Sequence, residues 1–253
     1  MAEEFAGKVR KRLPRQKVEL HATTHAGHAE ELAYLIARKE KNPLIISASG
    51  DGGYNEVING AVKAIKQGRA VTTGLLPAGN ANDHHRSLYE TDLVELLIKN
   101  QTRQIDLLKL TSTAGGQPVE RYAHSYIGFG LTAKIGRELN AAKLTFFKEV
   151  WLVVRALVTV RSIRLKINNE VRRFESIICS NINTMSKYLK ISAPSSVSDG
   201  KFEVTIFRRR NKLQLVLVLL QASFAGVKQD TQLSHYELET LAPTLVQVDG
   251  EII

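Results

Sequence analysis

The sequence has little of what builds disulfide-bonded, membrane-spanning or nucleic-acid-binding proteins. Its 253 residues include one cysteine, Cys179, so no disulfide can close within the chain. The N-terminal residues have no apolar signal-peptide core. The longest apolar run begins at Leu213, and Gln214 and Gln221 interrupt it, which favours a buried helix over a membrane span. Because a signal peptide and a membrane span are not expected, we expect a cytoplasmic protein. Aromatic residues make up only 6% and no nucleic-acid-binding motif occurs, so we expect no nucleic-acid partner.

The size and charge of the chain set its general class. With 43% hydrophobic residues, 253 residues can form two modest hydrophobic cores, and we expect two domains. Lys and Arg number 35 against 25 Asp and Glu, a net charge of +10. Such a charge attracts phosphate groups of nucleotides, nucleic acids or anionic bilayers, although it can also serve solubility alone.

The first part of the chain alternates helices and strands with short connections. In chain order the pattern predicts a helix over 5–13, a strand over 17–23, a helix around 29–37, a strand over 44–46, a helix around 57–65, and a strand and turn over 70–80. This alternation predicts a parallel α/β sheet, with functional loops after the carboxyl ends of its strands.

Beyond about Asp106 the pattern changes to strands that follow one another without regular helices. The exceptions are apparent helical stretches near 145–160 and 211–225. A turn is expected at Asn168 and Asn169. We therefore predict an α/β domain over residues 1–105 and a mostly antiparallel β domain over residues 106–253.

Two loops of the first domain suit phosphate binding. In "SASGDGGYNEV" the glycines let the backbone approach an anion, and a helix follows directly. Such a turn can also serve only as a tight connection between a strand and a helix, without binding an anion. The loop "PAGNANDHHR" follows the next strand, so in a parallel sheet the two loops would lie side by side. Adjacent histidines point in different directions, so helix capping by Asn82 or Asp83 is favoured over metal binding by His84 and His85.

Two acid-glycine turns occur in the second domain. Asp199 lies in "SSVSDGKFEV", and Asp249 and Glu251 lie in "VQVDGEII". Both can be ordinary turns. Alternatively, a carboxylate there accepts a hydroxyl proton while another organises Mg²⁺ on a nucleotide.

Taken together, these motifs resemble one family. "ASGDGGYNEVINGAV", "LLPAGNANDHHRSL", "ATTHAGHAEELA", "QIDLLKL", "YIGFGLTAKI", "KISAPSSVSDGKFEV" and "VQVDGE" are similar in order and spacing to the diacylglycerol kinase catalytic domain superfamily. That superfamily also includes sphingosine and ceramide kinases and bacterial lipid kinases. The resemblance extends over nearly the whole chain and is far more specific than either loop.

The resemblance implies both a fold and an activity. The fold is an N-terminal three-layer α/β nucleotide-binding domain with a parallel sheet, a β-sandwich lipid-substrate domain, and a cleft between them. The activity is ATP- and Mg²⁺-dependent transfer of the γ-phosphoryl group to a lipid hydroxyl, of diacylglycerol or a related lipid alcohol. The implied partners are ATP and a lipid at an anionic membrane, which a cytoplasmic, peripheral enzyme would reach. A homodimer is left open.

The resemblance also implies site residues. The general base belongs to the acidic turn with Asp249 and Glu251, and Asp199 belongs to a metal-associated acidic cluster. Asp51 would orient the loop, hold a metal-bound water or contact the nucleotide. The nucleotide-binding residues implied are Thr23, Gly50, Asp51, Gly52, Gly53, Tyr54, Asn55, Glu56, Gly79, Asn80, Asn82 and Asp83.

The chain also departs from the family pattern. Ser49 replaces the usual first glycine, as in sphingosine-kinase-like members, while Gly53 replaces a threonine or leucine and Asn80 a hydroxyl residue. Family members open with a further strand and phosphate loop and end with further strands, so the first domain would lack its first strand and the second its last strands. Either the sequence is a fragment or part of the nucleotide site is lost. A non-catalytic nucleotide- or lipid-binding relative and a NAD kinase-like phosphotransferase therefore remain as alternatives.

Overall fold

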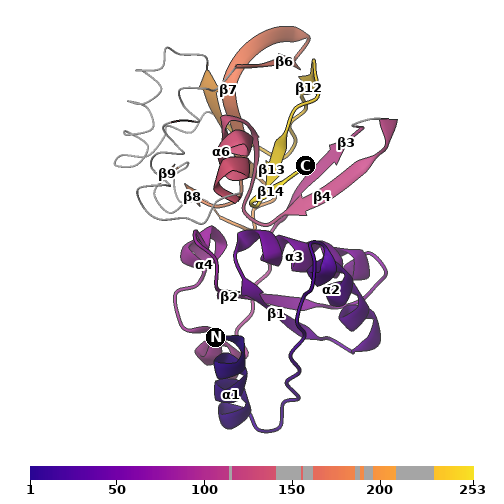
Figure 1. Cartoon of the computed structure of the whole chain (residues 1–253), viewed down its shortest axis with the longest axis vertical. Helices are drawn as coiled ribbons and strands as arrows, with labels where there is room; N and C mark the ends of the chain where they lie inside the picture. Colours follow the sequence, from indigo (N-terminus) through magenta and orange to yellow (C-terminus); the bar gives the residue numbers. More distant parts are fainter. Residues whose placement is uncertain (114–115, 141–154, 156–161, 186–188, 191–195, 209–230) are drawn as a thin grey trace. The chain divides into compact units, whose positions relative to one another are not determined.

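The computed structural model describes the chain except residues 114–115, 141–154, 156–161, 186–188, 191–195 and 209–230 (Figure 1). It divides into two compact units, residues 1–104 and residues 105–253. Among the described residues, no helix is long and apolar enough to cross a membrane. The predicted helical stretches near 145–160 and 211–225 lie almost wholly outside the described part of the chain.

Unit 1 is an α/β layer, as predicted. Strands β1 and β2 pair in parallel, with Leu44 opposite Thr72 and Ser49 opposite Pro77, so both strands end at the same edge. The elements in order are α1 (Ala2–Arg12), α2 (His28–Lys39), β1 (Leu44–Ser49), α3 (Asp51–Ile65), β2 (Thr72–Pro77), α4 (Asp83–Leu88) and α5 (Leu93–Ile98).

Helices α2 and α3 pack closely because a glycine lies at their contact. The apolar stripe of α2 buries Ala33 and Ala37, as its spacing predicts. A methyl group at Gly60 of α3 would collide with the carbonyl oxygen of Glu30 and lie 2.9 Å from the Cβ of Ala33. The backbones of the two helices therefore approach as far as glycine allows.

The strand predicted over residues 17–23 is wrong, because these residues form neither helix nor strand. The alternating pattern would bury one face, yet Leu20 is 50% exposed. Instead, the side chain of Arg10 donates a hydrogen bond to the carbonyl oxygen of Val18 (2.9 Å) and holds the segment against the end of α1. Alternation alone therefore did not identify a strand here, since no buried face accompanies it.

Unit 2 is mostly antiparallel β structure, also as predicted. Its main sheet has the strand order β11-β10-β7-β5-β13-β14, and β6 pairs with both β7 and β12. The elements are β3 (Leu108–Ser112), β4 (Val119–Ala123), β5 (Tyr126–Gly130), α6 (Leu131–Asn140), β6 (Ile163–Ile167), β7 (Glu170–Ser180), β8 (Thr184–Met185), β9 (Leu189–Lys190), β10 (Phe202–Arg208), β11 (Thr231–Leu233), β12 (Glu239–Thr240), β13 (Val246–Val248) and β14 (Glu251–Ile252).

The core of unit 2 lies on one face of this sheet, where alternate residues of the strands meet. Ile177, Val204 and Val248 are almost completely buried there. Cys179 belongs to the same cluster, and burial raises the pKa of its thiol to about 12. The hairpin between β6 and β7 turns at Asn168 and Asn169, both at positive φ (50° and 65°), which asparagine tolerates. The β6–β7 turn therefore follows the sequence signal.

Candidate active site

The two glycine-containing loops of unit 1 touch through their backbones. The first loop follows β1 and the second follows β2, at the shared end of the parallel pair. A methyl group at Gly50 would lie 3.0 Å from the Cα of Gly79, and one at Gly79 would collide with Gly50. The amide of Ala78 also donates to the carbonyl oxygen of Ser49 (2.9 Å). A side chain at either glycine would force the loops apart.

Asp51 joins the two loops. It is the first residue of α3 and is buried. Its carboxylate accepts the N–H of Asp83 (3.0 Å) and the N–H of His84 (3.2 Å), at the start of α4. These charge-assisted bonds hold the second loop against the first. An acid in a glycine-rich loop is therefore accounted for by the backbone donors that it accepts.

The first turn of α3 leaves N–H groups without helical acceptors. The helix is preceded by Gly50, whose carbonyl oxygen accepts the N–H of Tyr54 (3.1 Å). The amides of residues 51–53 come before this first helical hydrogen bond. Such groups, with the positive end of a 15-residue helix, can hold an anion. Gly52 and Gly53 keep this turn free of bulky side chains.

In the second loop the polar side chains have different positions. Asn82 adopts a left-handed conformation (φ 53°), and its amide closes the turn on Gly79 by accepting its N–H (2.9 Å) and donating to its carbonyl oxygen (2.8 Å). Asn82 precedes α4, but its side chain does not cap that helix. Asp83 is fully buried, whereas Asn80 is exposed to solvent. Of these three, Asn80 is therefore the side chain most open to a ligand.

Tyr54 and Asn55 face the interior of unit 1. The Tyr54 hydroxyl shares a hydrogen bond with the hydroxyl of Thr73 (2.9 Å), and only 2% of Tyr54 is exposed. Asn55 is fully buried and accepts a hydrogen bond from the amide of Asn59 (3.0 Å). Both side chains therefore contribute to packing around α3.

Glu56 reaches from α3 to the start of α2. One carboxylate oxygen accepts the N–H of Gly27 (2.8 Å), and the other accepts the N–H of Ala29 (3.1 Å). The segment that contains Thr23 leads directly into this helix start, and Thr23 is exposed. Glu56 thus positions the segment with Thr23, and both of its oxygens are engaged in doing so.

His84 and His85 lie among aromatic rings. His84 is buried, with its ring 5.1 Å from that of Tyr54, and His85 stacks on Tyr89 at 4.7 Å. Burial lowers the pKa of His85, and the charge of Arg86 lowers it further. Both rings take part in packing around α4.

In unit 2, Asp249 is fully buried, and its carboxylate accepts three backbone N–H groups. One carboxylate oxygen accepts the amides of Ser125 (3.0 Å) and Tyr126 (2.9 Å), and the other accepts the amide of His124 (2.6 Å). The His124 ring, also fully buried, has its Nε2 atom 3.4 Å from Asp249. No sequence motif pointed to His124. Glu251, two residues on, lies on β14 and is only partly buried.

Asp199 lies in an exposed turn of unit 2. Its carboxylate accepts the amide of Lys201 (3.0 Å) and a hydrogen bond from the side chain of Gln232 (3.1 Å). Asp106 lies close by and accepts the amide of Gly200 (2.7 Å). Within the described ranges, no three His, Cys, Asp or Glu side chains gather in a way that could hold a metal ion.

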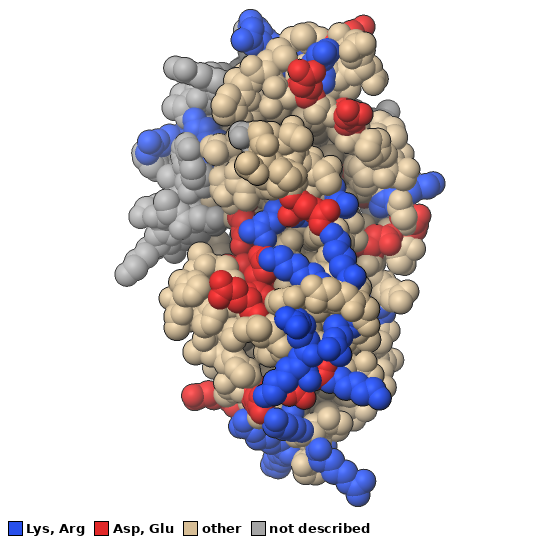
Figure 2. Space-filling model, turned by 90° about the vertical axis from the view of Figure 1, so that its right-hand side faces the viewer, with Lys and Arg blue, Asp and Glu red and all other residues tan. Residues whose placement is uncertain are grey.

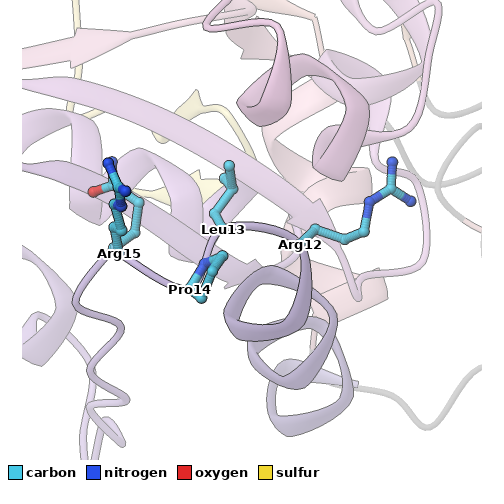
Figure 3. Close-up of a pocket in the computed structure, with 5 residues that line it drawn as sticks. Arg12, Leu13, Pro14 and Arg15 are labelled. Carbon is cyan, nitrogen blue, oxygen red and sulfur yellow. The ribbon is translucent and has the colours of Figure 1, made fainter.

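A hollow of about 300 Å³ opens at the turn after α1, lined by Arg12, Leu13, Pro14, Arg15 and Gln16 (Figure 3). The residues that line it include none of the predicted site residues. Arg12 is engaged with Glu95 of α5 (3.2 Å). The glycine loops therefore remain the candidate nucleotide site of unit 1.

Comparison with known proteins finds similarity to lipid kinases. Residues 1–110 match the model of the diacylglycerol kinase catalytic domain. A diacylglycerol kinase of Bacillus subtilis is 26% identical over 214 residues, which are 80% of this chain and 67% of that protein. One of Staphylococcus saprophyticus is 25% identical over 248 residues, 91% of this chain and 74% of that protein. The sphingoid long-chain bases kinase 1 of Arabidopsis thaliana is 41% identical over 68 residues, 26% of this chain and 9% of that protein.

Solved structures agree on the fold. A crystal structure of a diacylglycerol kinase from Bacillus anthracis superposes with a TM-score of 0.69 at 19% identity, covering 98% of this chain and 84% of that one. A second, titled as a putative diacylglycerol kinase of the same bacterium, gives 0.70. The matches agree with the family expected from the sequence motifs, the diacylglycerol kinases of bacterial type.

Proposed function

From the match of residues 1–110 to the diacylglycerol kinase catalytic domain, we propose that this chain is a lipid kinase. It transfers the γ-phosphoryl group of ATP to a hydroxyl of diacylglycerol or a related lipid alcohol. The observation that carries the proposal is the backbone contact of Gly50 with Gly79, closed by Asp51. This contact gives a shape in which phosphates can approach main-chain N–H groups, and phosphoryl transfer needs mainly such positioning.

The nucleotide phosphates lie against the first turn of α3 in this proposal. The amides of residues 51–53 face no helical acceptor and can donate to phosphate oxygens. Asn80, exposed in the second loop, is the side chain best placed to contact the nucleotide. Asp51, Asn82 and Glu56 then position the loops, because their side chains are engaged with backbone groups.

In the acidic turn, Glu251 accepts the proton of the lipid hydroxyl, and Asp249 positions the turn. Asp249 is fully buried with three backbone N–H donors, which leaves its oxygens poor acceptors for a substrate proton. Glu251 is partly exposed on the adjacent strand. A general base must come within hydrogen-bonding distance of the proton that it takes, which favours Glu251.

Mg²⁺ would neutralise phosphate charge in this reaction. The described acids do not gather into a site made of protein ligands alone. Mg²⁺ commonly binds through one or two carboxylates together with substrate phosphates. We therefore expect the ion to enter with the nucleotide, with Asp199 as the candidate carboxylate.

The lipid would be met at an anionic membrane surface. The net charge of +10 favours such a surface, and residues 8–17 hold six Lys and Arg without any Asp or Glu. Figure 2 shows a dense group of basic side chains on one face, with acidic side chains among them. Basic residues close to an anionic bilayer contribute about 1 kcal/mol each.

The proposal is tested with labelled ATP, Mg²⁺ and a panel of diacylglycerol, a sphingoid base and a polyprenol in mixed micelles, with NAD as a further acceptor. Label in one of the lipids supports the proposal and names the acceptor. Label in NAD alone would favour the NAD kinase-like alternative. A thermal shift with Mg·ATP and no labelled product would favour a non-catalytic relative. The departures from the family pattern at Gly53 and Asn80 are the reason to test this alternative.

A further inference from the structure

The side chain of Ser49, at the end of β1, fills the space next to Gly53 in the first turn of α3. A methyl group at Gly53 would lie 2.8 Å from the Cβ and 2.8 Å from the Oγ of Ser49. Carbon atoms normally keep about 3.5–4.0 Å apart, so any side chain at residue 53 requires Ser49 to move. The serine at the end of the strand therefore dictates the glycine in the helix.

Two neighbours hold the hydroxyl of Ser49. Alternate residues of a strand point to the same side, so Ser47 and Ser49 lie together, with their Oγ atoms 2.7 Å apart. Ser49 donates to the carbonyl oxygen of Gly50 (2.9 Å). A hydroxyl is both donor and acceptor, so Ser47 can donate to Ser49 while Ser49 donates onward.

The donated hydrogen of Ser49 is free to change its acceptor without leaving an unsatisfied group. The carbonyl oxygen of Gly50 already accepts the N–H of Tyr54 (3.1 Å). If the Ser49 hydroxyl turns toward an anion, this carbonyl keeps its helical donor. Ser49 is also only partly buried, whereas Ser47 is buried, so Ser49 is the one of the pair that a ligand can reach.

We propose that Ser49 supplies the hydroxyl that contacts a nucleotide phosphate at the start of α3, in the place that a side chain at residue 53 would otherwise take. This inference rests on the proposed function, because the anion is a phosphate of the bound nucleotide. Ser47 orients Ser49 from inside the unit. Ser49 and Gly53 are two departures from the family pattern. In this proposal they have one explanation: the side chain that would contact the phosphate lies at residue 49 and not at residue 53.

The experiment is a cycle of four proteins: wild type, Ser49→Gly, Gly53→Thr and the double variant. Thermal unfolding without nucleotide measures the packing, and calorimetric titration with Mg·ATP measures the contact. Gly53→Thr alone is expected to lower the melting temperature and weaken ATP binding, because its side chain meets Ser49. Ser49→Gly alone is expected to keep the fold and weaken ATP binding about fivefold to tenfold, the value of one hydrogen bond.

The double variant tests whether the effects of residues 49 and 53 depend on each other. With Ser49 removed, the threonine has room and carries a hydroxyl, so its melting temperature should return to that of Ser49→Gly and its ATP affinity should rise above that of either single variant. A Gly53→Thr protein as stable as wild type, or a Ser49→Gly protein with unchanged ATP affinity, would overturn the inference. Wild-type protein that binds no Mg·ATP would overturn it together with the proposed function. ATP binding without lipid turnover would count against the proposed function alone.

Discussion

Asp51, Glu56 and Asp249 use their carboxylates in the same way. Each accepts backbone N–H groups from a segment that is distant in sequence: residues 83–84 for Asp51, residues 27 and 29 for Glu56, and residues 124–126 for Asp249. A carboxylate that accepts several backbone N–H groups holds the segment that carries them in place. These three acids therefore hold segments of the chain in place, and the proposed function assigns the roles of base and metal ligand to the more exposed Glu251 and Asp199.

Asp51→Asn tests this role of a carboxylate in unit 1. The amide group of asparagine would face the N–H of Asp83 or His84 with another donor, which leaves buried donors unsatisfied. We expect a loss of about 1–3 kcal/mol in the free energy of unfolding, together with weaker ATP binding. Denaturant unfolding and ATP titration measure the two effects. Unchanged stability with abolished activity would mean that Asp51 acts on the ligand and not on the loops.

The sequence predicts the two loops of unit 1, but it does not predict which groups the acidic side chains bind. The glycines, the turn residues and the order of motifs are local patterns, and they were sufficient to predict the loops at one sheet edge. The partners of Asp249 are more than 120 positions away, and no local pattern reports such a contact. His124 was missed for the same reason. Glu56 was assigned to the nucleotide from the family resemblance, and in the structure its oxygens accept the amides of Gly27 and Ala29 at the start of α2.

At the scale of elements, close packing joins α2 to α3 in unit 1. Gly60 lets the helices touch, and Glu56, one turn earlier, ties the start of α2. The apolar stripes of both helices were sufficient to predict these elements, whereas the alternation over residues 17–23 was not, because a strand also needs a partner edge and a buried face.

Two glycine-to-alanine changes test the contact between α2 and α3. Gly60→Ala places a methyl group against the carbonyl oxygen of Glu30, and we expect a loss of about 1–3 kcal/mol in stability from overpacking. Gly7→Ala in α1 is the matched control, since a methyl group there meets nothing within 4 Å. It should stabilise by about 0.5–1 kcal/mol, because alanine favours the helix. Equal effects of the two changes in urea unfolding would contradict the close contact.

At the scale of the whole molecule, the proposed function uses two features, the net charge and the division into two units. Each of the two units has its own sheet, parallel in residues 1–104 and antiparallel in residues 105–253. The +10 charge belongs to the chain as a whole, and residues 8–17 form an acid-free run with six Lys and Arg. Chain length and the pattern of helices and strands led to the expectation of two domains, whereas composition alone also allowed solubility as the reason for the charge.

Binding to vesicles should depend on anionic lipid and on salt. We expect cosedimentation with vesicles that contain phosphatidylglycerol and little with phosphatidylcholine alone, weakening as salt screens the charges. Lys11→Glu with Arg15→Glu should reduce binding by on the order of tenfold or more. Lys39→Glu with Lys41→Glu makes the same change in net charge outside this run and should reduce binding less. Equal losses in both pairs would mean that net charge alone drives the association.

The central claim is phosphoryl transfer to a lipid hydroxyl with Glu251 as the base, and one measurement tests it most directly. Label from γ-labelled ATP is counted in extracted lipid for the wild type and for Glu251→Gln, after thermal unfolding has shown that both are equally folded. We predict labelled lipid from the wild type and a rate about 10²–10⁴-fold lower for the variant, the usual contribution of a general base. Equal rates for both proteins, or no labelled lipid from the folded wild type, would contradict the claim.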